Sequence, residues 1–530
     1  MPAKSNARIF KQNHPYHYWF EILLLFLGIA LMSGILFEHR WFMTFDGPAH
    51  VGNARIMTAL ISGDPAGIGG YYKFTTFPQP NWTGHFVMMV FSFFLNGAAA
   101  EKATLFVILI AMVFSFRYLL RSFDNYNNAH SLLILPVCFG MFFYYGSYNF
   151  CFSVVFLLLS IGYLQRSISR LDPGRIFMIF ILSGLTYFSH LSALPVLALI
   201  SAGIIAFHAL EAGKYAIVLS SKIYFRKQVL ILIPHLPFII LVYIYQQKFG
   251  SDNYQYLSFS EILQFIIDGQ YLIGFGFSEL VYTRSITIML YSVTLLTIIS
   301  RIYQWKGAVK DIRLKDVFFI ASVLVLLLVF ILPDSDTKGG MVTTRLLTFH
   351  ALFLAIWLCL GNTPSWARNL FPIAVLAITY FKATELSSQS KYQRELAGEI
   401  ERAAQFIAPG DVVLPVNRGD NWLTVNHPML LGADKPVVVL ENYEVWHGYF
   451  PLSDANQSPL AAFPPRHREW FCNELAPALY SGKFVPDHIF IQESSHIFPC
   501  ESDLNLFIEK NYVLKYSSQV CRLYSLRPNE

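Results

Sequence analysis

The chain has 530 residues, of which 55% are hydrophobic, 16% are aromatic and only 14% are charged, with a mean hydropathy of +0.45. A soluble protein carries about 25% charged residues, so this composition excludes an ordinary soluble enzyme and indicates a polytopic membrane protein. The formal net charge of +5 is too small to indicate nucleic-acid binding. The sequence has no P-loop and no GxSxG motif, which argues against an ATP-driven pump and a serine hydrolase.

Apolar runs predict eleven membrane spans. The first run, 19–37, is long enough to cross a bilayer, and it lacks a small-residue cleavage site, so we expect it to be retained. The short apolar run 85–95 predicts a re-entrant or interfacial helix within the first loop. The further spans are expected at 102–120, 130–145, 148–164, 175–190, 193–210, 228–247, 284–301, 316–332, 345–361 and 369–382.

The distribution of Lys and Arg predicts the orientation. With a cytoplasmic N-terminus, the inner loops carry most of the basic residues that precede the tail, as the positive-inside rule requires. The loops 38–101, 248–283 and 333–345, and everything after 383, then face outward. We therefore expect a multi-pass protein of the inner (plasma) membrane whose C-terminal region is periplasmic or extracellular.

The region 383–530 differs from the transmembrane region 1–382. It opens with an amphipathic helix, KYQRELAGEIERAAQFI, and it alternates short strands with helices, which favours a small α/β domain. The expected strands are DVVLPV, KPVVVLENY, DHIFIQ, YVLKYSS and VCRLYSL, and the further helices are RHREWFCNELAPALY and SDLNLFIEK.

Asp46, in the sequence TFDGPAH of the first outer loop, is the candidate catalytic residue. An Asp before an early-helix Pro is typical of an N-cap, but such a carboxylate can also take a proton from an acceptor hydroxyl. His50 follows one helical turn later and Arg55 lies further along the same helix. These two are either structural residues or a partner and a phosphate-binding group for Asp46. Asp46 and His50 are too few ligands to predict a metal site, so we predict no cofactor, although a divalent metal stays possible.

Other candidate substrate-binding residues lie at the expected outer ends of the spans. Lys73 and His85 flank an aromatic stretch that fits either a membrane-interface belt or a sugar site. His190 sits at an outer hairpin, where an ionisable group is a functional candidate. The basic residues Arg284, Lys338 and Arg345 either snorkel to the interface or bind a lipid phosphate.

The outer domain holds three cysteines, and an oxidising compartment permits one disulfide between them. Cys500 and Cys521 are the expected pair, because the final strand can return beside the end of DHIFIQESSHIFPC. Cys472 is expected to be a buried apolar residue within a helix. The alternative is three reduced, buried thiols.

Four segments resemble the GT-C superfamily of membrane glycosyltransferases, which includes protein O-mannosyltransferases and the aminoarabinose transferase of lipid A. They are FDGPAH after the first span, YYGSYNFCFSVVFLLLSIGYLQR, HLSALPVLALI and RLLTFHALFLA. The resemblance covers about residues 15–382 and implies a GT-C-like fold of about 11 transmembrane helices with a catalytic carboxylate in the first loop, which falls on Asp46. Many members have a second acidic residue close by. Here the nearest is Asp64, in a turn-like SGDPAG, which argues against metal dependence.

The resulting hypothesis is an inverting glycosyltransferase that acts on the outer face of the membrane. The donor would be a sugar on polyprenyl phosphate, and the acceptor hydroxyl would belong to a lipid, a glycan or a protein that the outer domain helps to select. One alternative is a transporter or flippase of lipid-linked intermediates, which predicts charges in mid-span, and few are present. The other alternative is a non-catalytic membrane assembly subunit.

Overall fold

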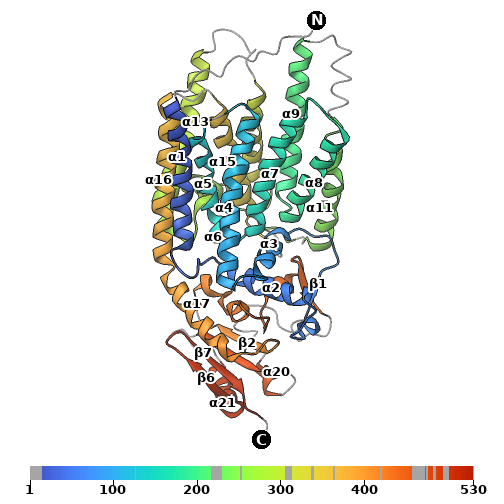
Figure 1. The fold of residues 1–530 in the computed structure, drawn as a ribbon, viewed down its shortest axis with the longest axis vertical. Coiled ribbons are helices and arrows are strands. Elements are labelled where there is room, and N and C mark those ends of the chain that lie inside the picture. The colour runs from blue at the N-terminus through green and yellow to red at the C-terminus, as the bar shows by residue number, and fades with distance from the viewer. Residues whose placement is uncertain are drawn as a thin grey trace.

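A bundle of long helices forms one half of the molecule, and a smaller mixed α/β body forms the other half (Figure 1). The computed structural model describes residues 15–528 apart from 126, 216–228, 251–252, 305–312, 336–338, 362–364, 418–420, 456–471, 473–475, 482–484 and 493–499. The helices of the bundle are α1 (Pro15–Phe37), α4 (Gly97–Ser122), α5 (Leu135–Cys138), α6 (Met141–Tyr144), α7 (Tyr148–Ser167), α8 (Pro173–Ser189), α9 (Ala193–Tyr215), α11 (Leu236–Phe249), α12 (Phe259–Asp268), α13 (Leu280–Gln304), α14 (Val317–Val329), α15 (Val342–Leu360) and α16 (Ser365–Gln389).

Within the described residues, six helices are long and apolar enough to cross a membrane. They lie at Trp19–Phe37, Gly97–Ser122, Tyr148–Ser167, Phe277–Tyr303, Val342–Leu360 and Leu370–Gln389, and shorter apolar helices accompany them. Large apolar side chains stay exposed on α1, α13 and α14, as expected for surfaces that face lipid. The prediction of a polytopic α-helical membrane protein is confirmed, whereas the number of eleven spans stays a prediction.

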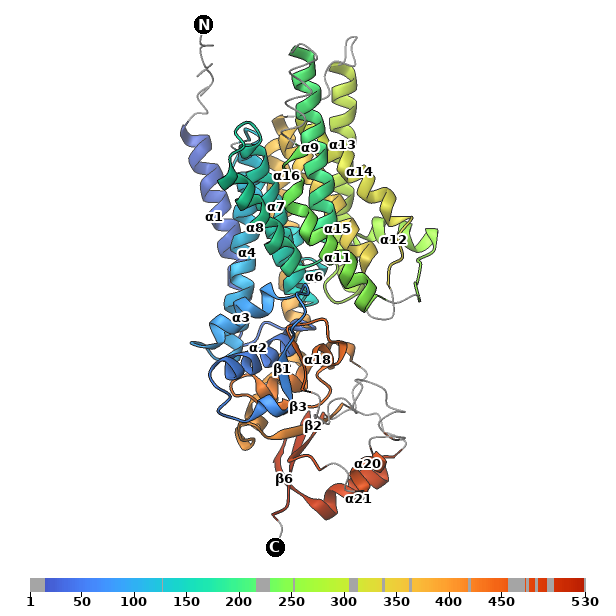
Figure 2. The same ribbon diagram turned by 90° about the vertical axis from the view of Figure 1, so that its right-hand side faces the viewer.

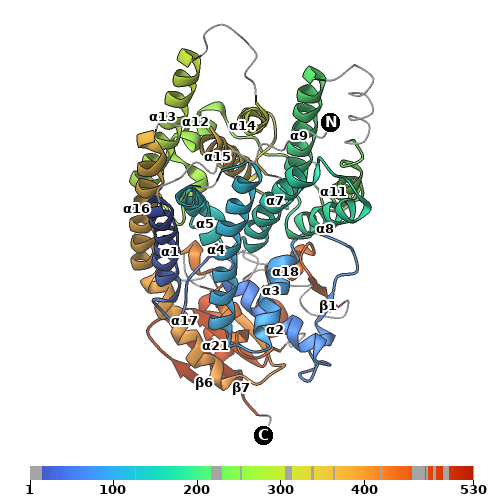
Figure 3. The same cartoon turned by 45° about the horizontal axis from the view of Figure 1, so that its top comes forward.

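The inner helices pack closely and the outer ones surround them. α4 packs against α7, and α14 packs against α15, which is buried along nearly its whole length. α1 lies beside α16 at one edge of the bundle, and α8 and α11 lie at the opposite edge (Figure 3). α12 projects to one side of the bundle in the view of Figure 2.

The predicted span 130–145 is a chain of short turns of helix. A 3₁₀ turn (Ala129–Ile134), α5 and α6 follow one another, with a break at Gly140 between α5 and α6. A side chain at Gly140 would meet the carbonyl oxygens of Tyr271 and Pro136 at 2.8 and 2.9 Å. The break therefore follows from a close approach of two backbones, which an apolar run does not reveal.

The first loop, residues 38–101, folds into α2 (Gly47–Ile61), a 3₁₀ turn (Ile68–Gly70), β1 (Tyr72–Phe74) and α3 (Thr83–Ser92). The apolar run 85–95 is therefore the helix α3, which packs on α2, α4, α7 and α8 where the bundle meets the smaller body (Figure 1).

The smaller body is built on a five-stranded sheet of order β3-β2-β5-β7-β6. β2 pairs in parallel with β3 and β5, and β7 pairs antiparallel with β5 and β6. Its strands are β2 (Val412–Asn417), β3 (Val438–Val439), β5 (His488–Gln492), β6 (Tyr512–Ser517) and β7 (Cys521–Leu526), and its helices are α17 (Lys391–Ala403), α18 (Tyr443–His447), α20 (Ala476–Tyr480) and α21 (Glu501–Asn511). Most of the predicted helix RHREWFCNELAPALY lies outside the described residues.

The first loop and the C-terminal region form one body. β1 pairs antiparallel with β4 (Leu452–Asp454), and α2 packs on the 3₁₀ turn His427–Gly432. α16 runs past residue 382 without a break and is followed directly by α17. Residues 38–101 and 383–530 therefore share an interior.

The predicted disulfide between Cys500 and Cys521 is wrong. Cys472 bonds to Cys500 across a Cα–Cα distance of 5.5 Å, and Cys521 is a buried free thiol in β7. β7 pairs with β5, so Cys521 faces Gln492 at the end of that strand, and the residues 493–499 still separate it from Cys500. A disulfide in this body fits an oxidising compartment.

Candidate functional site

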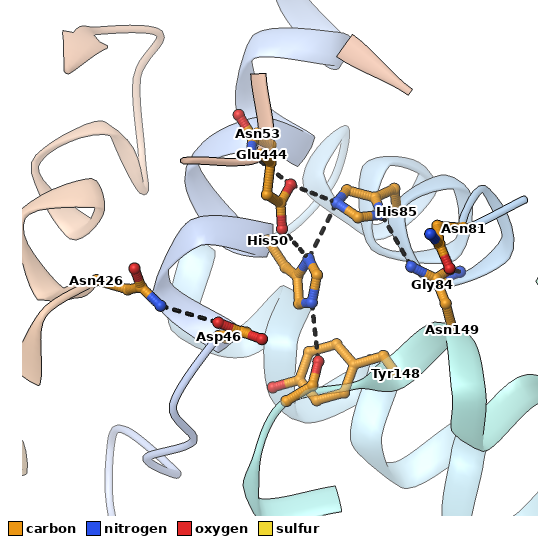
Figure 4. Close-up of polar contacts among 12 residues, drawn as sticks. Asp46, His50, Asn53, Asn81, Gly84, His85, Tyr148, Asn149, Asn426 and Glu444 are labelled. Carbon is orange, nitrogen blue, oxygen red and sulfur yellow. Dashed lines mark hydrogen bonds and ion pairs between the residues drawn. The ribbon is translucent and has the colours of Figure 1, made fainter. Parts of the chain in front are cut away.

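Asp46 lies immediately before α2, but its side chain does not cap the helix. Its backbone is helical (φ −91°, ψ −10°), and the amide of Gly47 donates instead to the Thr44 hydroxyl at 3.0 Å. The N-cap interpretation of Asp46 is therefore wrong. The Asp46 carboxylate accepts a hydrogen bond from Asn426 Nδ2 at 2.9 Å, and the same amide also donates to the Phe45 carbonyl (Figure 4). The C-terminal body thus fixes a half-buried carboxylate of the first loop.

The turn before α7 holds the backbone on which Asp46 stands. The amides of Phe45 and Asp46 donate to the carbonyls of Tyr144 and Tyr145, each at 3.0 Å. Gly146 has a φ of +81°, and a Cβ there would lie 2.8–3.0 Å from Gly47 N and from Asp46 atoms. This position therefore needs glycine for its conformation and for the close approach.

A second carboxylate, Glu101 of α4, lies under the start of α2. It is buried and accepts hydrogen bonds from the hydroxyls of Tyr148 (2.7 Å) and Thr44 (3.4 Å). A Cβ on Gly47 would come within 2.0 Å of its oxygen, so glycine at this position lets α2 approach α4. The sequence analysis missed Glu101, because it stands at the start of an apolar helix with no motif around it.

Three buried side chains converge one turn further along α2. His50 Nδ1 lies 2.7 Å from Glu444 Oε1, His85 Nε2 lies 2.7 Å from Glu444 Oε2, and the two ring nitrogens are 3.0 Å apart (Figure 4). His50 comes from α2, His85 from α3 and Glu444 from α18, so this cluster joins three segments that are remote in sequence.

Charge pairing governs the protonation of this cluster. Burial alone would raise the pKa of Glu444, but His85 and His50 hold that pKa far below its usual range. Burial likewise opposes protonation of His50, yet Glu444 and then Asp46 raise the net pKa of its imidazole. For His85 burial dominates and the pKa is lowered. The cluster is thus an ionised carboxylate between two imidazoles.

Tyr443, next to Glu444, lies against Asp46. Its pKa is raised well above the ordinary value, chiefly by burial and then by the Asp46 carboxylate, to which its hydroxyl is hydrogen-bonded. The phenol therefore stays protonated beside the Asp46 carboxylate. Asn426 and Tyr443 together orient the carboxylate.

Arg345, in the first turn of α15, is half-buried. Its Nη1 donates to the Gly340 carbonyl at 2.6 Å, its guanidinium lies 5.5 Å from the centre of the Phe142 ring, and its Nε is buried without a hydrogen-bond partner. Tyr145 and Tyr449 interact with it electrostatically, and His190 lies near it. The Tyr145 ring also packs against the Phe45 ring with a centroid distance of 4.7 Å, so Arg345 and Asp46 share one neighbourhood.

Aromatic rings cover this neighbourhood from the side of the C-terminal body. Trp422 is 43% exposed, and its ring centroid lies 5.0 Å from that of Phe45 and 5.9 Å from that of Tyr145. A partly exposed indole beside a carboxylate is a surface on which a sugar ring can stack.

The remaining predicted site residues do not join Asp46. Arg55 donates to the carbonyls of Ser92, Leu95 and Ala433, which favours its structural role. Lys73 is exposed on β1. Arg284 pairs with Asp268 of α12 at 2.7 Å, and Lys338 lies outside the described residues.

His427, next to Asn426, makes the body around Asp46 sensitive to acid. Burial lowers the pKa of this imidazole to about 3, against a small opposing effect of the Gln393 carbonyl. The unfolded chain binds a proton near pH 6.5 and the folded one does not, so this contribution to stability is complete above about pH 6.5 and is lost as the pH falls toward 3.

We therefore expect the thermal midpoint to fall with acidification, with a loss of at most about 1.4 kcal/mol per pH unit from this group. His427→Gln should flatten the dependence between pH 6 and pH 4. Unfolding of the detergent-solubilised protein at several pH values would check this, with the difference between variant and wild type isolating His427 from other histidines. Parallel curves for the two proteins would contradict the prediction.

Comparisons with known proteins identify the fold. Searches with protein-family models and among curated sequences give no match. Among solved structures, the chain is similar to ArnT from Cupriavidus metallidurans bound to undecaprenyl phosphate, with a TM-score of 0.54 and 10% identity over 96% of this chain and 97% of that one. The apo state of the same protein matches with a TM-score of 0.50 and 11% identity, over 96% of this chain and 98% of that one.

ArnT is a GT-C aminoarabinose transferase. At this identity the likeness shows the fold alone. The predicted GT-C-like fold is confirmed, and it extends over the C-terminal body as well as the helical bundle.

Proposed function

We propose that this protein is a membrane glycosyltransferase that moves a sugar from a polyprenyl-phosphate donor to an acceptor hydroxyl on the outer face of the membrane. The observation that carries the proposal is the position of Asp46. In a chain with the fold of ArnT, an oriented carboxylate stands between the helical bundle and the C-terminal body, in the same neighbourhood as a half-buried arginine. ArnT was solved with undecaprenyl phosphate bound, which supports a polyprenyl-phosphate donor here.

The groups around Asp46 supply the parts that such a transfer needs. Arg345 offers a guanidinium whose planar fork matches a phosphate, and its Nε is available for a donor oxygen. Trp422 offers an aromatic face for the sugar. Asp46, held by Asn426 and Tyr443, accepts the acceptor's proton as its oxygen attacks the anomeric carbon. The sugar–phosphate bond breaks on the opposite face, so the configuration inverts and polyprenyl phosphate leaves.

The proposal includes the location of the reaction. The disulfide Cys472–Cys500 supports an outward position for the C-terminal body, because oxidising conditions prevail outside the cytoplasm. An extracytoplasmic site also fits a lipid-linked donor, which needs no nucleotide sugar. The acceptor is a lipid, a glycan or a protein that contacts the C-terminal body.

Reconstitution in liposomes tests this function. Purified protein would be given polyprenyl-phosphate-linked sugars and candidate acceptors, and mass spectrometry would follow both the glycosylated acceptor and the released polyprenyl phosphate. Transfer with release of polyprenyl phosphate is the expected result. Movement of intact lipid-linked sugar between leaflets without any transfer would overturn the proposal in favour of a flippase.

A further inference from the structure

The cluster formed by His50, His85 and Glu444 is built like a metal-binding site. Each residue offers one ligand atom, and these three atoms lie within 4.8 Å of one another. The side chains are 5%, 1% and 1% exposed, so all three ligand atoms point into the protein interior. Two imidazoles and one carboxylate are a ligand set of the kind found in zinc proteins.

Hydrogen bonds on the far side of each ring orient the two imidazoles, so that His50 Nδ1 and His85 Nε2 point into the cluster. His50 Nε2 lies 2.8 Å from the Gly146 carbonyl, which can only accept, so this nitrogen carries a proton and Nδ1 is the nitrogen that can offer a lone pair to a metal. The His85 ring is held on its far side by the Asn81 carbonyl and by Asn149, whose Nδ2 lies 3.3 Å from His85 Nδ1, and these contacts keep Nε2 directed at the cluster. Imidazole ligands of metals usually donate their other nitrogen to a carbonyl or a carboxylate.

The Glu444 carboxylate is held by a hydrogen bond, and aromatic rings pack beside the two histidines. Asn53 Nδ2 donates to Glu444 Oε2 at 2.5 Å, which fixes the carboxylate toward the two rings. The rings of Tyr148 and Phe450 flank the histidines with centroid distances of 5.1 Å (Tyr148 to His50) and 5.6 Å (Phe450 to His85). The surroundings therefore shield the three ligands from bulk solvent and restrict their movement.

The distances suit a small cation. Tetrahedral coordination with bonds of roughly 2.0–2.1 Å separates neighbouring ligand atoms by about 3.3 Å. The two ring nitrogens are 3.0 Å apart, and each lies 2.7 Å from one oxygen of the Glu444 carboxylate, so small shifts of the three side chains make room for the ion. Two unprotonated ring nitrogens 3.0 Å apart would repel each other, and a cation beside the carboxylate removes that repulsion.

We propose that His50, His85 and Glu444 bind one divalent metal ion of the zinc class, which joins α2, α3 and α18. A nitrogen-rich set without sulfur or further carboxylates favours Zn²⁺ over Mg²⁺ or Ca²⁺. Three protein ligands leave a fourth position for water. The metal fastens the C-terminal body to the first loop, and it holds the turn of α2 in which the His50 amide donates to the Asp46 carbonyl at 3.1 Å.

Metal content tests the proposal without reference to any activity. The full chain would be purified in detergent without chelators, incubated with Zn²⁺ and desalted. Inductively coupled plasma mass spectrometry should then find about one zinc per chain. His85→Asn and Glu444→Gln should each lower this value at least tenfold. His488→Asn is the matched control, because His488 is also buried and paired with a carboxylate, Asp411, outside the cluster. It should keep its zinc.

A measurement on the wild-type protein tests the proposal even if the variants do not fold. X-ray absorption at the zinc edge should show two imidazole nitrogens and at least one oxygen at roughly 2.0–2.2 Å, with no sulfur. Less than one tenth of a zinc per chain in the wild type would overturn the proposal. So would full occupancy in folded His85→Asn and Glu444→Gln, or sulfur ligands in the absorption spectrum.

Discussion

Asp46→Asn should lower the rate of sugar transfer by about 10²–10⁴-fold, the range typical of a lost general base. The amide has nearly the shape of the carboxylate and can still accept the hydrogen bond from Asn426, but it cannot take a proton from the acceptor. We expect the loss in kcat, with the apparent affinity for the lipid-linked donor changed little, because Asp46 meets the acceptor rather than the donor phosphate.

A neighbouring acid provides the control for this experiment. Asp64 lies in the same loop and accepts hydrogen bonds from the amides of Ile68 and Gly69, so Asp64→Asn changes the same functional group at a structural turn. Its transfer rate should stay within a few-fold of wild type. Asp46→Ala is also informative, because Asp46 does not cap α2 and its removal leaves the Thr44 cap intact. A folded Asp46→Asn protein with near wild-type transfer would remove Asp46 from the mechanism.

The sequence predicts the helices of the bundle well because each is a local pattern. A long apolar run is stable only in a membrane or in a large protein core. The runs at 19–37, 148–164 and 345–361 correspond to α1, α7 and α15. The strands β2, β5, β6 and β7 also agree with the prediction, since each is a short β-branched or aromatic run between turns. β1 and β4 have only three residues each and carry no such pattern, so their pairing was not predictable.

The candidate site could be predicted only in part. Asp46, His50 and His85 were recognisable in the first loop because polar residues stand out after an apolar span. Their partner Glu444 is 359 residues away from His85, and it enters the site through α18, a helix of five residues. Nothing local distinguishes Glu444 from any surface glutamate, because its role depends on how the C-terminal body packs on the first loop.

The same limit applies to the turn before α7. The segment GSYNF belongs to one of the four segments that resemble the GT-C superfamily, and three of its residues make contacts that the sequence does not reveal. The Gly146 carbonyl accepts from His50, the Tyr148 hydroxyl donates to Glu101, and Asn149 accepts from the Gly84 amide at the start of α3. These contacts join the bundle to the first loop, and their partners could not be named from the sequence alone.

Arg345→Ala should weaken donor binding by about 10–100-fold, the effect of losing charge-assisted hydrogen bonds to a phosphate. Arg345→Lys keeps the charge but loses the planar fork, so we expect an intermediate loss. Binding of undecaprenyl phosphate to the detergent-solubilised protein, followed by its thermal shift and by competition with lipid-linked sugar, measures the change. The buried Nε of Arg345 and its hydrogen bond to the Gly340 carbonyl indicate that the guanidinium is held in one position and does not snorkel to the membrane interface.

Arg284 supplies the matched control for Arg345. It also stands near the outer start of a long helix, but it is tied to Asp268, so Arg284→Lys should leave donor binding within about twofold of wild type. Equal losses at both positions would point to a general effect of outer-surface charge on an anionic lipid. Unchanged donor binding in both Arg345→Ala and Arg345→Lys would exclude Arg345 from the phosphate site. A loss confined to Arg345 would assign the donor phosphate to the side of the Asp46 neighbourhood where α15 begins.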